Sequence, residues 1–135
     1  MNRRFLLLQS SFALAVLFLF SGTAMAENNP TLGRKCSKAD IVIYQGATAP
    51  LPSGIPTYTV EIYNICPSGC NISGIHVACG WFSSATLVNP KIFKRLEYND
   101  CLVNDGQPLP SGSALQFRYA TTFLYPLSVS TVVCP

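Results

Sequence analysis

Six cysteines and one histidine are the residues of this chain whose types could perform chemistry. A cysteine or serine beside a histidine could act as a nucleophile, and cysteines together with a histidine could hold zinc. His76 would have to serve either site, because it is the only histidine in the 135 residues. The cysteines are Cys36, Cys66, Cys70, Cys79, Cys101 and Cys134. Which chemistry is open to them depends on whether they are oxidised.

The start of the chain predicts an oxidising destination. Arg3 and Arg4 precede an apolar run that ends at Phe20, and residues 24–26 read Ala-Met-Ala, the small-residue pattern of a signal-peptidase site. The pattern predicts a secretory signal peptide over residues 1–26, since the run is shorter than the ~20 residues of a membrane span. An even number of cysteines in a small secreted domain then predicts three disulfides, with their pairing left open.

Zinc is the competing interpretation of the cysteines. Cys66 and Cys70 have a spacing found in zinc sites, but the chain has no second close pair. His76 should also face away from Cys79, because the two positions have opposite parity along one strand. We therefore expect no metal and no cofactor.

Three carboxylates raise the possibility of glycoside hydrolysis. Glu97, Asp100 and Asp105 could supply a carboxylate pair, but they bracket a cysteine-containing loop where turn and surface acids are common. With every cysteine assigned to a disulfide, no catalytic set remains, and we expect no enzyme. A binding module is left, either a protein ligand for a receptor or a carbohydrate-binding module of the extracellular matrix.

Charge excludes a further class of partner. Removing Arg3 and Arg4 with the signal leaves seven basic residues against six acidic ones, a net charge of +1. A nucleic-acid-binding domain needs a dense basic stripe, so no nucleic acid is expected. Residues 27–35 are polar and predict a flexible arm; its Arg34-Lys35 pair is either a processing site or two solvated charges. Residues 36–135 form the cysteine-rich domain, and no membrane insertion is expected after signal cleavage.

The elements that carry these residues look like strands. Positions 75, 77, 79 and 81 hold Ile, Val, Cys and Trp, a period of two that predicts one buried face including Trp81. The same period recurs over 57–65 and 115–119, and further strands are expected over 41–44 and 127–134. Residues 45–56 and 104–106 predict turns, whereas 91–101 fits either a short helix or an irregular strand.

This arrangement predicts an all-β fold, either an antiparallel sandwich or a small barrel. We take it as a disulfide-stabilised antiparallel β-sandwich that follows the signal peptide. The expected core consists of Ile41, Ile43, Tyr58, Val60, Ile62, Ile75, Val77, Trp81, Leu115, Phe117, Leu127 and Val129.

Two surface features are predicted. Lys91, Lys94 and Arg95 gather three of the seven basic residues, which indicates either a patch that docks an acidic partner or a solvated face balanced by nearby acids. Asn71-Ile72-Ser73 is an N-glycosylation acceptor, so Asn71 should lie on a surface loop. The inward parity of Trp81 counts against a sugar-stacking platform.

Three segments carry a resemblance to a known family. They are IPTYTVEIYNICPSGCNISGIHVACGWFSSA, NPKIFKRLEYNDCLVNDGQPLPSG and FRYATTFLYPLSVSTVVCP. The chain from Cys36 to Pro135 resembles the tapetum determinant family, small secreted cysteine-rich proteins of flowering plants.

The resemblance implies a secreted signalling ligand in the apoplast that helps to specify tapetal cells of the anther. Its implied partners are the ectodomain of a leucine-rich-repeat receptor kinase and a co-receptor. Our hypothesis is that Lys91, Lys94, Arg95 and Tyr98 form the patch that meets the receptor.

Overall fold

The computed structural model describes residues 35–134. The predicted signal peptide over 1–26 and residues 27–34 of the predicted arm lie outside the described residues. Within residues 35–134, no helix has the length and apolar character needed to cross a membrane.

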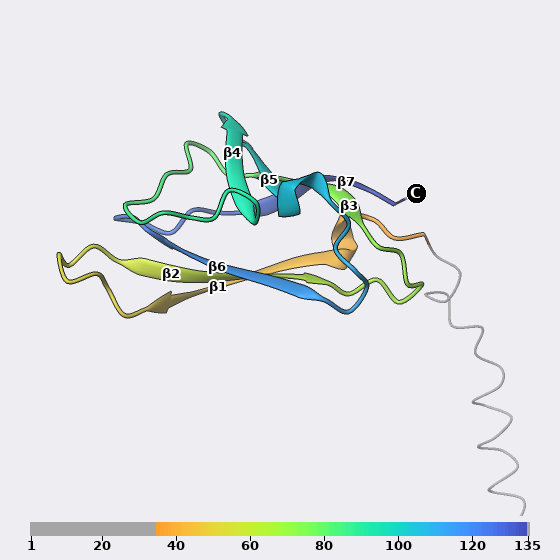
Figure 1. Ribbon diagram of the computed structural model, residues 1–135, viewed down its shortest axis with the longest axis horizontal. Helices are drawn as coiled ribbons and strands as arrows, with labels where there is room; N and C mark the ends of the chain where they lie inside the picture. Colours follow the sequence, from red (N-terminus) through yellow and green to blue (C-terminus); the bar gives the residue numbers. More distant parts are fainter. Residues whose placement is uncertain (1–34, 135) are drawn as a thin grey trace, which may run out of the picture. The chain divides into compact units, whose positions relative to one another are not determined.

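The described chain is built from strands, and its two short helices are single 3₁₀ turns. The strands are β1 Ile41–Thr48, β2 Thr57–Asn64, β3 Ser73–Ala78, β4 Phe93–Glu97, β5 Asp100–Val103, β6 Ala114–Ala120 and β7 Ser128–Val133, and the turns are η1 Lys38–Asp40 and η2 Asn104–Gly106. One sheet has the order β1-β2-β6 and the other the order β4-β5-β3-β7, with antiparallel pairing in both (Figure 1). The all-β prediction is confirmed.

Strand β2 shows why the alternating sequence produces a one-sided sheet. Val60 lies opposite Phe117 of β6, and Ile62 lies opposite Ile43 of β1 and Leu115 of β6. Directly paired residues point to the same side of a sheet, so these side chains share one face. Val60 and Ile62 are fully buried. The predicted strand over 57–65 is therefore confirmed, apart from its last residue.

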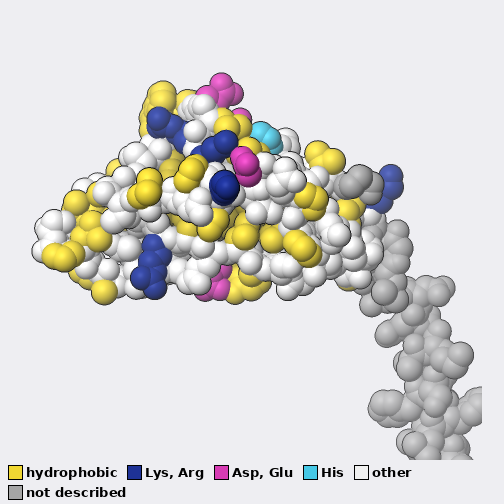
Figure 2. Space-filling model, in the orientation of Figure 1, with side chains coloured by type: hydrophobic (Ala, Val, Ile, Leu, Met, Phe, Trp, Pro, Cys, Tyr) yellow, Lys and Arg dark blue, Asp and Glu magenta, His cyan; other side chains and the backbone are white. Residues whose placement is uncertain are grey.

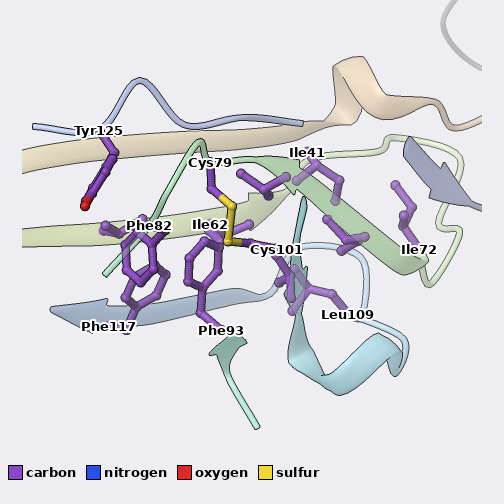
Figure 3. Close-up of a cluster of buried hydrophobic side chains, with 14 of the residues drawn as sticks. Ile41, Ile62, Ile72, Cys79, Phe82, Phe93, Cys101, Leu109, Phe117 and Tyr125 are labelled. Carbon is purple, nitrogen blue, oxygen red and sulfur yellow. A yellow bond between two sulfur atoms is a disulfide. The ribbon is translucent and has the colours of Figure 1, made fainter. Parts of the chain in front are cut away.

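An aromatic cluster fills the core where the two sheets meet. Phe82 has the rings of Phe93, Phe117, Tyr119 and Tyr125 around it, with centroids 4.9 to 6.5 Å away. Figure 3 labels Phe82 with Phe93, Phe117 and Tyr125. Phe93 of β4 stacks on Phe117 of β6 at 4.5 Å, so a ring from each sheet is in contact. We call these five residues the aromatic core.

Three disulfides join distant parts of the chain: Cys36–Cys66, Cys70–Cys134 and Cys79–Cys101. Cys70–Cys134 ties the loop before β3 to the end of β7, and Cys79–Cys101 ties the end of β3 to β5. The bridged residues are 30, 64 and 22 positions apart, so in the chain-entropy account each bridge contributes ~3–4 kcal/mol. The sequence had left this pairing open.

Strand boundaries differ from the prediction at two places. β1 continues to Thr48, so residues 45–48, predicted to be part of a loop, are strand paired with the first half of β2. The undecided segment 91–101 contains β4 and the start of β5, which pair with each other. Residues 104–106 form the turn η2, but the chain leaves it for the other sheet, so no hairpin closes there.

The prediction for Trp81 was wrong, since its side chain is 65% exposed. β3 ends at Ala78, and Gly80 adopts the left-handed conformation with φ of 57°, which interrupts the alternation of sides. After that turn it is Phe82 that points inward, with only 7% of its surface exposed.

The rest of the predicted core is buried or partly buried. Ile43, Tyr58, Leu115, Leu127 and Val129 pack against the core from partly exposed positions. Tyr119, which the alternation over 115–119 placed on the buried face, is fully buried, and the sequence reasoning missed several other core residues, which are Ile72, Phe82, Phe93, Val103, Leu109 and Tyr125.

Candidate functional site

The β4–β5 hairpin carries most of the predicted binding residues. In its register Phe93 lies opposite Val103 and Arg95 opposite Cys101, so Phe93 and Arg95 have the same parity. Phe93 is buried whereas Arg95 is exposed. The hairpin projects from the top of the molecule in Figure 1, away from the other sheet, which explains the difference. Figure 2 shows basic, acidic and hydrophobic side chains gathered over this projection.

Trp81 contacts both Arg95 of β4 and Tyr98 of the turn between β4 and β5. The Trp81 and Tyr98 rings have centroids 4.7 Å apart, and the Arg95 guanidinium carbon lies 5.3 Å from the Trp81 ring centroid. That distance is typical of a cation–π contact. Tyr98 is 58% exposed. We call these three residues the surface cluster.

The backbone beneath the surface cluster is fastened to the hairpin. The Asn99 N–H donates to the Gly80 carbonyl at 2.7 Å, and the Gly80 N–H donates to Asn99 Oδ1 at 3.0 Å. Asn99 has a φ of 60°, a conformation that asparagine tolerates better than most residues. The Cys79–Cys101 bridge lies next to this hydrogen-bonded pair in the sequence. The two residues before Trp81 are therefore held to the hairpin, Cys79 by a disulfide and Gly80 by two hydrogen bonds.

A tyrosine from a separate loop supports the cluster from the core side. The Tyr125 hydroxyl donates to the Trp81 carbonyl at 3.3 Å and accepts from the Ser83 N–H at 3.2 Å. Its ring belongs to the aromatic core, so the backbone of Trp81 is anchored to that core while its side chain remains outside.

The charges around the cluster are only partly balanced. Lys94 Nζ lies 3.2 Å from Asp105 Oδ1, and His76 Nδ1 lies 2.7 Å from Asp100 Oδ1. Both pairs are solvent-accessible, so each contributes little to stability. Among residues 35–134, neither Lys91 nor Arg95 forms an ion pair.

The four predicted receptor-binding residues do not all come together. Arg95 and Tyr98 meet at Trp81, whereas Lys94, the neighbour of Arg95 on the strand, reaches toward Asp105. Lys91 is exposed in the turn before β4. Their role in binding stays a prediction. Sequence reasoning missed Trp81, and the signal that could have found it is the glycine at position 80.

A shallow hollow borders the open side of β4. It is lined by residues 82–88, Pro90, Phe93, Lys94 and Arg95. The aromatic core forms part of its floor through Phe82 and Phe93, and cations lie along one side. The hollow therefore extends the surface next to Arg95 and offers apolar contacts there.

The other predicted residues are placed as follows. The sulfurs of Cys36, Cys70 and Cys134 lie within 4.8 Å of one another, but each is in a disulfide and is not a thiolate ligand. Asp100 and Asp105 are engaged by His76 and Lys94.

Asn71, the predicted glycosylation site, is exposed, and its Oδ1 accepts a hydrogen bond from the Ser111 N–H at 3.2 Å. Whether it carries a glycan stays a prediction.

A protein-family model described as "Tapetum determinant 1, C-terminal" matches residues 37–135. The chain belongs to the tapetum determinant family. "TPD1 protein homolog 1" of Arabidopsis thaliana is 65% identical over 103 residues, which cover 76% of this chain and 58% of that protein. "TPD1 protein homolog 1A" of Oryza sativa subsp. japonica is 53% identical over 106 residues, covering 73% and 47%.

The family resemblance predicted from the sequence is confirmed. The chain spans about half the length of the tapetum determinant relatives it matches. No solved structure gives a significant match to it.

Proposed function

We propose that this tapetum determinant protein is a secreted signalling ligand of plant development, exported by the peptide over 1–26 to the apoplast. There its two sheets form a disulfide-stiffened β-sandwich that binds the ectodomain of a leucine-rich-repeat receptor kinase in the anther. Family membership supports the developmental role. Three disulfides within about a hundred residues support an extracellular location.

The observation that carries the binding proposal is the surface cluster. Trp81, Arg95 and Tyr98 are exposed, yet the Trp81 ring contacts both of the others, and Cys79 of the Cys79–Cys101 bridge is two residues from Trp81. A rigid binding surface loses little conformational entropy when it binds. A leucine-rich-repeat array offers a long concave face to such a projection. Occupying that face would bring a co-receptor and its kinase domain to the first kinase, and this needs no catalysis by the ligand.

Titration of the secreted chain, lacking residues 1–26, against the receptor ectodomain tests this proposal. We expect saturable binding of the unmodified protein and weaker binding of the Lys94→Glu/Arg95→Glu double variant. Arg118→Glu is the matched control, because Arg118 is an exposed cation of β6 in the other sheet. Absence of saturable binding by the unmodified protein would overturn the receptor-ligand proposal. If Arg118→Glu weakens binding as much as the double variant does, the assignment of the β4–β5 hairpin as the receptor-binding surface is overturned.

One observation favours a second function, carbohydrate binding in the cell wall. The sequence predicted that Trp81 points inward, which counted against stacking of a sugar ring on it. The structure removes this objection, because the Trp81 side chain is exposed. Retention of the protein on insoluble wall polysaccharide, measured beside the ectodomain titration, separates the two functions. Retention without ectodomain binding would favour the carbohydrate-binding module.

A further inference from the structure

We infer that Trp81 is the residue that anchors the complex, and that it enters an apolar pocket of the receptor ectodomain with a carboxylate at its rim. The flanking cations Lys91 and Lys94 act mainly on the rate of encounter. This inference rests on the proposed function. It adds a description of the receptor surface that the surface cluster would contact.

The first argument is that the exposed position of Trp81 contributes little to the fold. The side chain lies outside the aromatic core, and the core is closed by Phe82 without it. Leu96 and Tyr98 of the same hairpin are also exposed. An apolar patch on a small protein commonly marks an interaction site. Tryptophan, tyrosine and arginine are also the residue types most enriched among residues that dominate binding energy.

The second argument is that the cluster is formed before the partner arrives. Arg95 and Tyr98 contact the indole, and the backbone of residue 81 is held by the Tyr125 hydroxyl. A side chain already held by its neighbours gives up less freedom when it becomes buried in a complex. The cluster therefore has the rigidity that an anchor requires.

The third argument concerns charge and selects the partner's chemistry. Arg95 forms no ion pair among residues 35–134. Closing a partner over Trp81 would bury the guanidinium beside it, and a buried cation without an acceptor is strongly unfavourable. The partner must supply that acceptor, and a carboxylate matches the planar guanidinium best. The contacts of Arg95 and Tyr98 with the indole also leave it less suited to stacking a sugar ring.

The cations and the indole should affect different rate constants. Exposed charges at the edge of an interface mainly change association, whereas buried aromatic anchors mainly change dissociation. Lys94 is the neighbour of Arg95 on β4, Lys91 lies in the turn before this strand, and both side chains are solvent-accessible. The effect of charge reversal at these lysines should therefore fade in high salt, whereas truncation of Trp81 should not.

The test compares association and dissociation rates of three variants with the receptor ectodomain. Trp81→Ala should raise the dissociation rate at least about tenfold and change the association rate less than about threefold. Lys91→Glu/Lys94→Glu should instead slow association, and the difference should shrink at high salt. Tyr44→Ala is the matched control, because Tyr44 is an exposed aromatic residue of β1 in the other sheet.

Urea unfolding of the same variants shows that a loss of binding is not a loss of fold. A further variant, Arg95→Ala, should raise the dissociation rate by a smaller factor than Trp81→Ala does. If Trp81→Ala dissociates from the ectodomain at the same rate as the unmodified protein, the anchoring role of Trp81 is overturned. The proposed function is not affected by that result. Wall-polysaccharide retention that disappears in Trp81→Ala, with ectodomain binding unchanged, would also overturn the anchoring role. Failure of the unmodified protein to bind any ectodomain overturns the proposed function and the anchor together.

Discussion

Trp81 and Phe82 are neighbours in the chain, but they belong to two different regions of the molecule. Phe82 is at the centre of the aromatic core and contacts four other rings. Trp81 lies outside that core and belongs to the surface cluster on the β4–β5 hairpin. The comparison indicates that one aromatic region holds the fold and that the other is left available for a partner. Each of the following variants tests that separation.

The largest effect is expected at the centre of the core. Phe82→Ala should lower the free energy of unfolding by ~3–5 kcal/mol, because it removes the ring contacts and leaves a cavity between the sheets. Urea unfolding at neutral pH measures this loss. Leu87→Ala is the control: Leu87 is 94% exposed, and its change should stay within ~0.5 kcal/mol. A loss below ~1 kcal/mol for Phe82→Ala would mean that the core is not organised around this ring.

Removing the bridge beneath the surface cluster should have the next effect. The double variant Cys79→Ala/Cys101→Ala opens a link between residues 22 positions apart and should destabilise the domain by ~3 kcal/mol. The shift of the thermal midpoint measures it, and mutating both cysteines leaves no free thiol. If this variant keeps full stability, the bridge constrains only the hairpin and not the whole domain.

A smaller effect is expected from the buried hydroxyl of Tyr119. It donates to Gln45 Oε1 at 2.6 Å and accepts from the Tyr125 N–H at 3.1 Å, so Tyr119→Phe should cost ~1–3 kcal/mol. Burial raises the pKa of Tyr119 above its ordinary value of 10.0. The unfolded chain therefore ionises first, and this stabilisation is present below pH 10 and is lost as the pH rises further.

Unfolding free energies at neutral pH and above pH 10 check both parts of this prediction. The stability difference between the unmodified protein and Tyr119→Phe should narrow at the higher pH. A difference that stays constant across that range would contradict the burial of the hydroxyl.

The smallest effect on stability is expected at the surface cluster. Trp81→Ala should change the unfolding free energy by less than ~1 kcal/mol, since an exposed cation–π contact and surface packing are all that is lost. The same urea titration used for Phe82→Ala measures it. A loss as large as that of Phe82→Ala would show that Trp81 is part of the fold and would remove the separation between the two regions.

The strands with clean alternation could be predicted from the sequence. β2 and β6 bury the residues whose parity the sequence indicated, because a one-sided sheet imposes a period of two. β4 could not be decided, since its edge position leaves Arg95 and Leu96 exposed and hides the pattern. The three disulfides were expected from their even number, but their pairing depends on distances that only the fold defines.

The candidate site could be predicted only in part. Arg95 and Tyr98 were identified as a local cluster of basic and aromatic residues, whereas Trp81 was assigned to the core. The alternation that predicted an inward-facing Trp81 does not extend to this residue, because β3 ends at Ala78 and Gly80 adopts a positive φ. A single backbone conformation therefore decided which of two adjacent rings became buried. The contact between Arg95 and Trp81 joins two segments that are distant in the sequence, and no local pattern indicates it.

The most direct test of the account uses the fact that Trp81 is the only tryptophan of the chain. Incorporation of 5-fluorotryptophan places a single fluorine label at this position, and its NMR signal can be followed while unlabelled receptor ectodomain is added. We predict a solvent-exposed signal in the free protein that shifts and broadens to saturation as the complex forms. A signal that stays unchanged while the complex forms by an independent measurement would contradict the central claim that the surface cluster is the binding surface.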